Sequence, residues 1–382
     1  MGKRAKAAGK ATRRRFLAAS AAAAAAVAMP QVSRAQTRVW RFQSTWAPKD
    51  IFHEFALDYA GKVNALSGNR LKFDVLAASS VVPPFQVQQA VHTGILDGGH
   101  GVCSYWYGRH KAFALFGSPP SFGWDAHGVL AWFYHGGGES LYKELVNDIL
   151  KLNLVGFLCF PMPTQPLGWF KKEITGTQSF KGLKFRTVGL SAELFTEMGA
   201  AVTVMPAGQI APSLERGLLD GAEFNNASSD RLLGFPDVSK VCMLQSYHQN
   251  AEQFEVIFNK TKYDSLPERL RTQLNYVAEA ANADMMWKAI DRYSQDYIEL
   301  QTKDKVKFYK TPDGILQKQL EIFDQVVAKR KDNALFVEIL ESQKKFAERA
   351  VRWDLDTYVS RRMAYNYYFG QKKPEQKEQK KA

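Results

Sequence analysis

The segment Leu183-Lys184-Phe185-Arg186-Thr187 gives the first indication of the fold of this 382-residue chain. It is short, it alternates apolar and polar residues, and this pattern is typical of a β-strand. The residues that follow predict a helix over 192–198 and a second strand over 201–205. A strand, a helix and a strand in succession indicate an α/β fold.

The same pattern occurs near the start of the chain. Val39-Trp40-Arg41-Phe42 and the segment 71–76 predict strands, and between them apolar residues recur every three to four positions over 52–63, as in a helix with one buried face. About 335 structured residues exceed the size that one hydrophobic core serves, so we expect two lobes. We assign residues 36–160 with about 250–280 to the first lobe and residues 161–249 to the second.

The C-terminal part of the chain has a different pattern. Leu316, Leu320, Phe323 and Val327 begin an apolar stripe at helical spacing that continues to Trp353, and we expect long helices throughout residues 281–368. An apolar face that finds no partner in its own chain must find one on another. The stripe therefore favours a homodimer, and the alternative is that these helices brace both lobes of one chain.

The two termini carry most of the positive charge. Residues 1–35 hold eight Lys or Arg and no acid, then a short apolar run, and Ser33-Arg34-Ala35 fits a cleavage site. Because Arg13-Arg14-Arg15-Phe16-Leu17 fits the twin-arginine pattern, we expect a twin-arginine signal peptide over 1–35. The whole chain has a net charge of +13, of which +5 remains without this segment. A basic tail at 369–382, which we expect to be disordered, supplies much of that +5.

This distribution of charge narrows the function classes. A nucleic-acid-binding or membrane-surface protein needs basic residues clustered on a folded face, and the body of this chain is nearly neutral. Cys103, Cys159 and Cys242 have no metal-site spacing and are most simply buried apolar residues. Patterns typical of zinc hydrolases, serine hydrolases and phosphate-binding loops do not occur in the sequence. The absence of these patterns favours a binding protein over an enzyme, and the alternative is a catalytic Ser, His and Asp that only the fold brings together.

A few polar residues stand in apolar surroundings. Gln165 precedes Gly168-Trp169-Phe170, Arg186 ends an apolar strand, and Glu223 precedes Phe224. An Arg in such a place either pairs with a nearby acid or binds an anion, and its planar donors suit a carboxylate or a phosphate. A carboxylate and an amide oxygen could together hold a hard cation, which prefers oxygen ligands.

Several blocks in fixed order carry a family resemblance. They are Lys181 to Arg186, Gly199-Ala200, Met205 to Ile210 and Leu214 to Glu223, with further likeness at 71–75, 94–99, 105–112, 168–174 and 254–259. Together they resemble the extracytoplasmic solute receptors of tripartite ATP-independent periplasmic (TRAP) transporters, over most of the chain. The sequence looks most similar to the branch that binds 2-oxo and 2-hydroxy monocarboxylates.

The resemblance implies roles for individual residues. Arg186 would form a salt bridge with the ligand carboxylate, and Gln165, Tyr107 and Phe224 would also contact the ligand. A sodium or calcium ion would be held by oxygens of Gln165, Glu223, the Phe224 backbone and Gln249. Two departures bear on this site: Phe224 replaces the usual Trp, and Gln249 stands where many members have Glu. A neutral residue there weakens cation binding, and a more apolar pocket would admit a larger or aromatic carboxylate.

The resemblance also implies an architecture and a partner. We expect a two-lobed periplasmic binding protein fold, α/β, with a cleft between the lobes that closes over the ligand and long C-terminal helices. The partners would be a small carboxylate and the membrane subunits of a TRAP transporter, in the periplasm. Some receptors of this branch look like dimers with exchanged terminal helices, which favours the homodimer.

Overall fold

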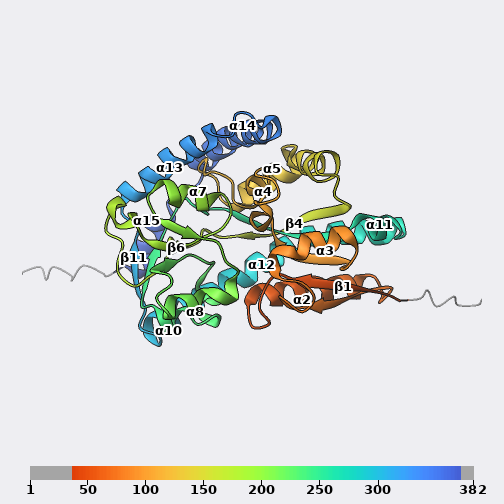
Figure 1. The fold of residues 1–382 in the computed structure, drawn as a ribbon, viewed down its shortest axis with the longest axis horizontal. Coiled ribbons are helices and arrows are strands. Elements are labelled where there is room, and N and C mark those ends of the chain that lie inside the picture. The colour runs from red at the N-terminus through yellow and green to blue at the C-terminus, as the bar shows by residue number, and fades with distance from the viewer. Residues whose placement is uncertain (1–36, 371–382) are drawn as a thin grey trace, which may run out of the picture. The chain divides into compact units, whose positions relative to one another are not determined.

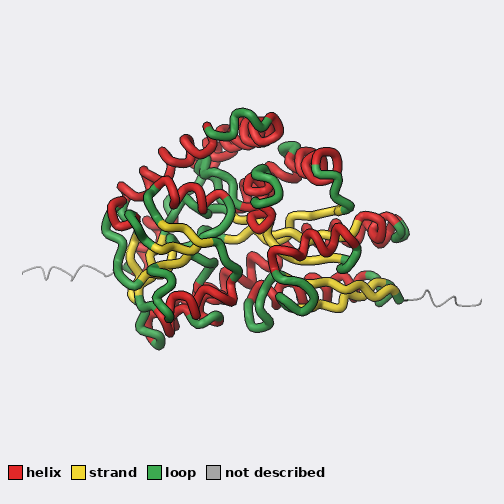
Figure 2. Tube along the Cα trace, in the orientation of Figure 1, coloured by secondary structure: helices red, strands yellow, loops and turns green. Residues whose placement is uncertain are grey.

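The computed structural model describes residues 37–370, and the expected signal peptide and all but two residues of the expected tail lie outside this range. Two β-sheets organise the described part of the chain, which confirms the α/β fold (Figure 1). Figure 2 shows their strands as separate groups with helices packed around them. Among the described residues, no helix combines the length and hydrophobicity that a membrane span requires.

The first sheet has the strand order β2-β1-β3-β10-β4. Its strands are β1 (Arg38–Ser44), β2 (Leu71–Leu76), β3 (Gly98–Val102), β4 (Leu154–Met162) and β10 (Glu252–Asn259). β1 and β3 are parallel, whereas β10 runs antiparallel to both β3 and β4. The chain thus leaves this sheet after β4 and returns to it with β10.

The second sheet has the order β11-β9-β5-β8-β6-β7. Its strands are β5 (Gly168–Phe170), β6 (Lys184–Arg186), β7 (Ala201–Thr203), β8 (Gly221–Ala222), β9 (Val241–Leu244) and β11 (Lys307–Lys310). β6 lies between β7 and β8, parallel to both. β11 is a strand within the segment 281–368 that we predicted to be helical, and it joins this sheet beside β9. The prediction overlooked it because the strand is short and carries lysine at both ends.

Helices connect and cover the strands. Those before β4 are α2 (Ile51–Leu66), α3 (Val87–Thr93), α4 (Phe113–Gly117), α5 (Ala126–His135) and α6 (Gly138–Lys143), with the short helices η1 (Pro84–Gln86), η2 (Cys103–Trp106) and η3 (Glu144–Ile149). Those after β4 are η4 (Thr177–Phe180), α7 (Leu190–Glu197), η5 (Ala207–Gln209), α8 (Ile210–Glu215), α9 (Ala227–Leu232), α10 (Phe235–Val238), α11 (Lys260–Asp264) and α12 (Glu268–Thr302). We predicted a limit near residue 280 between the first lobe and the C-terminal helical region. That limit falls inside the continuous helix α12.

Helix α2 shows how the sequence pattern produces the core. Phe52, Phe55 and Tyr59 are buried on one face against the first sheet, and each such side chain contributes about 1.5–3 kcal/mol through burial. The helix begins at Asp50, whose carboxylate accepts a hydrogen bond from the Phe52 amide. Asp50 also accepts one from the Ser229 hydroxyl of α9, 2.8 Å away. The start of α2 is thereby tied to the segment that follows Phe224. All three cysteines are buried and unbridged, as expected.

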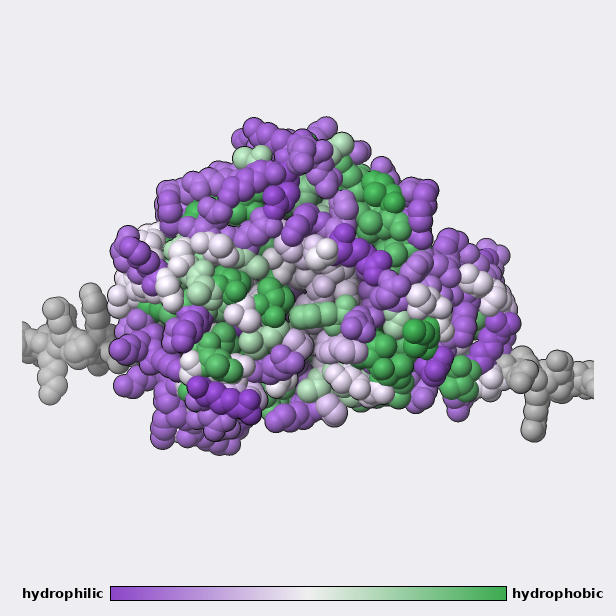
Figure 3. Space-filling model, viewed as in Figure 1, coloured by the Kyte–Doolittle hydropathy of each residue, from purple (hydrophilic) through white to green (hydrophobic). Residues whose placement is uncertain are grey.

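Three helices complete the described chain: α13 (Asp313–Ala328), α14 (Ala334–Thr357) and α15 (Arg361–Phe369). α13 buries Ile315, Ile322 and Phe323 in the core beside the second sheet. The first half of α14 buries Leu335 and Ile339 in a core that also serves the first sheet. The outer faces of α13 and α14 are largely hydrophilic in the view of Figure 3. α13 and this half of α14 therefore pack within their own chain, as an internal brace would.

Candidate ligand-binding site

Arg186 ends strand β6, and its side chain is almost completely buried, with 1% exposed. Its Nε and Nη2 donate to the Met205 carbonyl oxygen over 3.0 and 2.8 Å. Its Nη1 donates to the Glu223 carbonyl oxygen and, over 2.9 Å, to Glu223 Oε1. These bonds use four of the five N–H groups of the guanidinium. Within residues 37–370 the fifth, on Nη2, has no hydrogen-bond partner, so this conformation leaves one donor for a ligand.

Glu223 follows strand β8 and is completely buried. Burial raises the pKa of its carboxyl to about 7, against the opposing influence of the Arg186 charge and of the Thr187 hydroxyl and Val188 amide nearby. Its Oε2 accepts no hydrogen bond of normal geometry from any described residue. The sequence left open whether Arg186 pairs with an acid, and here it pairs with Glu223. Glu223 Oε2 still has no donor of normal geometry among the described residues.

Gln165 and Gln249 lie next to each other, because the backbone N–H of Gln165 donates to the backbone carbonyl oxygen of Gln249 over 3.2 Å. The Gln165 side chain donates to Asn225 Oδ1 over 3.2 Å and to Glu252 Oε2 over 2.7 Å. Gln249 donates to Ser118 and to Glu252 Oε1 over 3.3 and 3.4 Å. Among the described residues, neither side-chain oxygen, Gln165 Oε1 nor Gln249 Oε1, has a hydrogen-bond donor.

Glu252 is a residue that the sequence analysis missed. It lies at the start of β10 with 3% of its surface exposed, and it accepts hydrogen bonds from Gln165, Ser118 and Ser104. Burial, together with repulsion from Glu223, raises its pKa to about 8. An acid three residues after Gln249 and two before Phe254 could have indicated a further polar group here, but the family resemblance pointed to Gln249.

The buried side-chain oxygens of Gln165, Glu223 and Gln249 are of the kind that a hard cation prefers. The described residues contain no group of three or more His, Cys, Asp or Glu side chains that could hold a metal ion. Three buried oxygens without donors come from two amides and one carboxylate: Gln165 Oε1, Glu223 Oε2 and Gln249 Oε1. Neutral and anionic oxygen donors of this kind suit sodium or calcium.

Phe224 lies beside Arg186, with the guanidinium carbon 5.6 Å from its ring centre. Its ring also contacts Trp46, with 6.4 Å between centres, and stacks on Phe235. Phe224 is 3% exposed, so the ring closes one side of the Arg186 position and keeps water from it. This arrangement strengthens electrostatic interactions there.

Tyr107 is buried, but its hydroxyl donates to Glu193, and the Lys111 ammonium lies 3.9 Å above its ring. Tyr105, two residues earlier, is placed differently. Its ring packs against Trp46 and Phe85, and the charge of Arg186 acts on its hydroxyl, although burial has the larger effect and raises its pKa. Both tyrosines belong to the aromatic segment 105–112 and line the same cavity, and the family resemblance implied the ligand contact for Tyr107.

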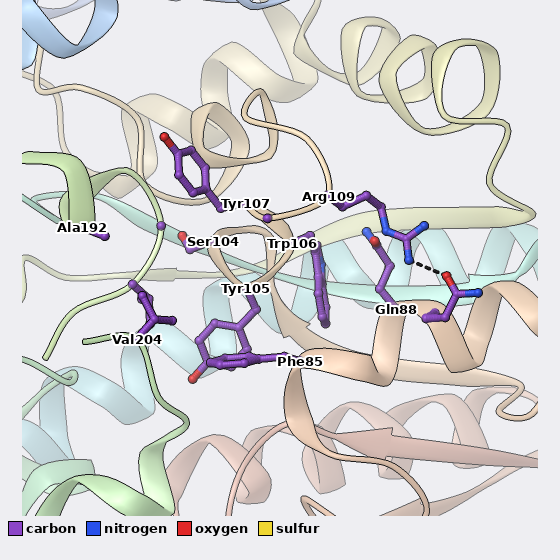
Figure 4. A pocket seen from close by; sticks show the side chains of 13 residues that line it. Phe85, Gln88, Ser104, Tyr105, Trp106, Tyr107, Arg109, Ala192 and Val204 are labelled. Atoms are coloured by element: carbon purple, nitrogen blue, oxygen red, sulfur yellow. Dashed lines mark hydrogen bonds between the residues drawn. The ribbon is translucent and has the colours of Figure 1, made fainter. Parts of the chain in front are cut away.

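A cavity of about 450 Å³ adjoins these residues, within the range of small-molecule sites. It is lined by Phe85, Gln88, Gln89, Ser104, Tyr105, Trp106, Tyr107, Gly108, Arg109, Val188, Gly189, Ala192 and Val204. Figure 4 shows Val204 and Ala192 on one side and Gln88 and Arg109 on the other. Gly189 has φ +62°, and a Cβ there would lie 3.2 Å from the Ser104 Cβ, so glycine permits this close approach. The lining comes from segments near both sheets, as a cleft between lobes requires.

Comparison with known proteins places this chain in one family. Residues 42–333 match the family model of bacterial extracellular solute-binding proteins, family 7 (DctP). The chain belongs to this family. The expected resemblance to TRAP transporter receptors is confirmed, and the chain is a periplasmic solute-binding protein and not an enzyme.

Individual relatives of this solute-binding protein are moderately similar in sequence. A monocarboxylate 2-oxoacid-binding periplasmic protein of Nostoc sp. is 27% identical over 317 residues, which are 82% of this chain and 85% of the relative. A TRAP solute-binding protein of Pseudoalteromonas atlantica, solved with sodium and pyruvate, has a TM-score of 0.80 at 27% identity, covering 87% of this chain and all of that one. One of Colwellia psychrerythraea, solved with calcium and pyruvate, has a TM-score of 0.78 at 26% identity, with the same coverage.

A further solved structure supports the fold of this solute-binding protein. A TRAP transporter solute-binding protein of Bordetella bronchiseptica, a dimer with copurified calcium and picolinate in one site, has a TM-score of 0.81 at 24% identity. It covers 87% of this chain and 97% of that one.

Proposed function

We propose that this solute-binding protein captures a 2-oxo or 2-hydroxy monocarboxylate together with a sodium or calcium ion and presents it to TRAP membrane subunits. The observation that carries the proposal is the buried guanidinium of Arg186, paired with Glu223, together with buried oxygens of Gln165, Glu223 and Gln249 that have no donor among the described residues. The 2-oxoacid-binding relative and the two pyruvate-bound relatives support the ligand class.

The charges at this position favour a cation. Arg186 contributes one positive charge, and Glu223 and Glu252 are buried carboxyls. Burial raises the pKa of both, and repulsion from Glu223 raises that of Glu252 further. A ligand carboxylate would add another negative charge to a site shielded from water. A bound sodium or calcium ion would supply the missing positive charge and coordinate oxygens of both the protein and the ligand. Gln165, Glu223, Gln249 and the Phe224 carbonyl are the residues that we propose would hold it.

The protein residues have separate roles in this proposal. Arg186 would orient the carboxylate through its remaining Nη2–H, and Phe224 would exclude water from the pair. Closure of the two lobes would remove the remaining solvent, and the closed form would be recognised by the membrane subunits.

A second ligand class is a larger or aromatic carboxylate. The cavity lined by Val188 and Val204 is also bounded by the rings of Phe85 and Tyr105, and its volume exceeds what a three-carbon acid fills. The Bordetella bronchiseptica relative, which copurified with the aromatic acid picolinate, favours this alternative.

Mass spectrometry of the small molecules released from protein purified without added ligand tests the proposal. We expect a 2-oxo or 2-hydroxy acid, recovered unchanged after incubation, and calorimetry with that acid should show binding that needs sodium or calcium. Absence of binding for every carboxylate tried, with folded protein, would contradict the proposal.

We also propose that the chain is a homodimer held by its last helices. Every residue from Arg352 to Phe369 is exposed, and these include Trp353, Tyr358, Tyr365, Tyr367, Tyr368 and Phe369. α15 buries no residue, and an isolated helix of nine residues is marginal in water. A second copy of the chain would cover these aromatic residues. That the Bordetella bronchiseptica relative is a dimer supports this proposal.

A further inference from the structure

Gln88 is a buried amide with no hydrogen bond. It lies in α3 with 1% of its surface exposed, and neither Oε1 nor Nε2 has a partner among residues 37–370. Its neighbours Val87, Ala90 and Val91 fix the helix in the core. A buried amide without partners destabilises a protein, so such a group needs an explanation outside the folded chain itself.

Gln88 lines the cavity that Tyr105, Val188 and Val204 also line. Figure 4 shows its side chain beside the Trp106 ring, across the cavity from Val204. Val204 immediately precedes Met205, whose carbonyl oxygen holds the Arg186 guanidinium. The charge of Arg186 acts on the hydroxyl of Tyr105, which also lines the cavity. The cavity therefore reaches from the unpaired Gln88 amide to residues close to Arg186.

Aromatic rings bound the space between these two ends. Phe85 and Tyr105 meet edge to face, with 4.7 Å between ring centres and 80° between planes. Tyr105 also meets Trp106 at 88°. Flat apolar groups bind well along such rings, because aromatic pairs favour offset and edge-to-face contacts.

We infer that Gln88 binds a polar group at the far end of an elongated ligand, whose carboxylate lies at Arg186 and whose flat apolar middle lies along Phe85 and Tyr105. The inference rests on the proposed function, since it takes the carboxylate position from it. Gln88 is then a specificity-determining residue: its Oε1 accepts from a ligand O–H or N–H, and its Nε2 donates to a ligand oxygen. An acid that lacks the distal polar group leaves the amide unpaired and binds less well.

Calorimetry with four acids tests this inference: pyruvate, phenylpyruvate, and phenylpyruvate carrying a hydroxyl at the meta or the para position. For the wild-type chain we expect at least one hydroxylated acid to bind about tenfold more tightly than phenylpyruvate, the effect of one hydrogen bond. Gln88→Leu should abolish this preference and leave the affinity for pyruvate unchanged. Its melting temperature without ligand should equal or exceed that of the wild type, because the substitution removes an unpaired buried amide.

Gln89→Leu is the matched control. Gln89 is the next residue of α3 and also lines the cavity, but it is exposed and its amide already accepts a hydrogen bond from Arg109. This variant should keep the preference for the hydroxylated acid.

The remaining outcomes separate the two proposals. If phenylpyruvate and its hydroxylated forms bind equally well, or if Gln88→Leu keeps the preference, a water molecule satisfies the Gln88 amide and the inference is wrong. If pyruvate binds and no aromatic acid does, the inference fails while the proposed function stands. If none of the four acids binds to folded protein supplied with sodium or calcium, the proposed function itself fails for this ligand class.

Discussion

Gln165 Nε2 lies 2.7 Å from Glu252 Oε2, and both side chains are buried. Gln165 belongs to the loop between β4 and β5, whereas Glu252 begins the strand by which the chain returns to the first sheet. The bond therefore joins the segments that cross between the sheets. With the bond to Asn225 Oδ1, it uses the N–H groups of the Gln165 side chain, and Gln165 Oε1 is free of donors among residues 37–370.

This relationship predicts that Glu252→Gln lowers the affinity of the site for its cation above pH 8, where Glu252 is ionised. The substitution then removes a negative charge beside Gln165 and Gln249, and fewer charged groups bind a cation less tightly. We expect about tenfold more sodium or calcium to be needed for half-maximal ligand affinity, measured by calorimetry over a cation titration after chelation.

Glu255→Gln is the control for this experiment. Glu255 is a buried glutamate of the same strand, but its carboxylate accepts hydrogen bonds from Trp106 and Tyr142 and not from Gln165 or Gln249. Equal cation requirements for Glu252→Gln and wild type would exclude Glu252 from the site.

Arg186→Lys should weaken ligand binding by about 100-fold or more. A lysine keeps the charge, but it cannot donate to Met205 and Glu223 and still present a directed N–H to a carboxylate. Arg70→Lys is the matched change, because Arg70 Nε donates to the Ser67 carbonyl oxygen at the end of α2, outside the cavity. Calorimetry decides the point, and a lysine variant that binds within a few-fold of wild type would remove Arg186 from the ligand site.

Much of the fold could be predicted from local pattern. The expected strand 71–76 coincides with β2, and the expected helix over 52–63 lies within α2, because strong apolar periodicity reports burial directly. β11 could not be predicted this way. It is a four-residue edge strand whose exposed lysines and half-buried Phe308 and Tyr309 give no strand alternation, and only its pairing with β9 makes it a strand.

For the site, the sequence indicated which residue types stand in apolar surroundings but not which atoms meet. That Arg186 pairs with Glu223 across 37 positions follows from β6 and β8 lying side by side, a tertiary property. Gln88 gave no signal, since a single Gln in an apolar helix resembles a surface residue until its burial is known. The aromatic segment was found, but the choice between Tyr105 and Tyr107 depends on the direction of each side chain.

Removal of the last residues should convert a dimer to a monomer. A chain ending at Val351 keeps the residues of α13 and α14 that pack in the core and loses only the exposed segment from Arg352 onward. We expect light scattering at micromolar concentration to give the mass of two chains for the intact mature protein and of one for the shortened protein, with ligand affinity retained. Because a cut before Leu316 would also remove the core residues Ile322 and Phe336, the shorter deletion is the cleaner experiment. A monomeric mass for the intact chain would leave the helices as an internal brace.

Acid should destabilise the folded chain partly through His100. Its imidazole is buried in β3, where its Nδ1 accepts a hydrogen bond from Trp46 Nε1 over 3.0 Å. Burial, and secondarily the charge of His53, lowers the pKa of His100 to about 3 from its usual 6.5. The folded state therefore holds this histidine neutral while the unfolded chain takes up a proton below pH 6.5. Its contribution to stability is complete above pH 6.5 and is lost as the pH falls towards 3, by up to about 1.4 kcal/mol per pH unit.

His100→Asn isolates this contribution, because the Asn carbonyl oxygen can accept the Trp46 hydrogen bond but does not titrate. Urea unfolding at pH 7 and pH 4.5 should show that the wild type loses about 2–3 kcal/mol more on acidification than the variant. His248, whose pKa burial also lowers to about 3, is present in both proteins, as are the buried acids, so their effects cancel in the comparison. Equal losses of stability in the two proteins would mean that His100 is protonated in the folded state, in conflict with its role as the acceptor for Trp46.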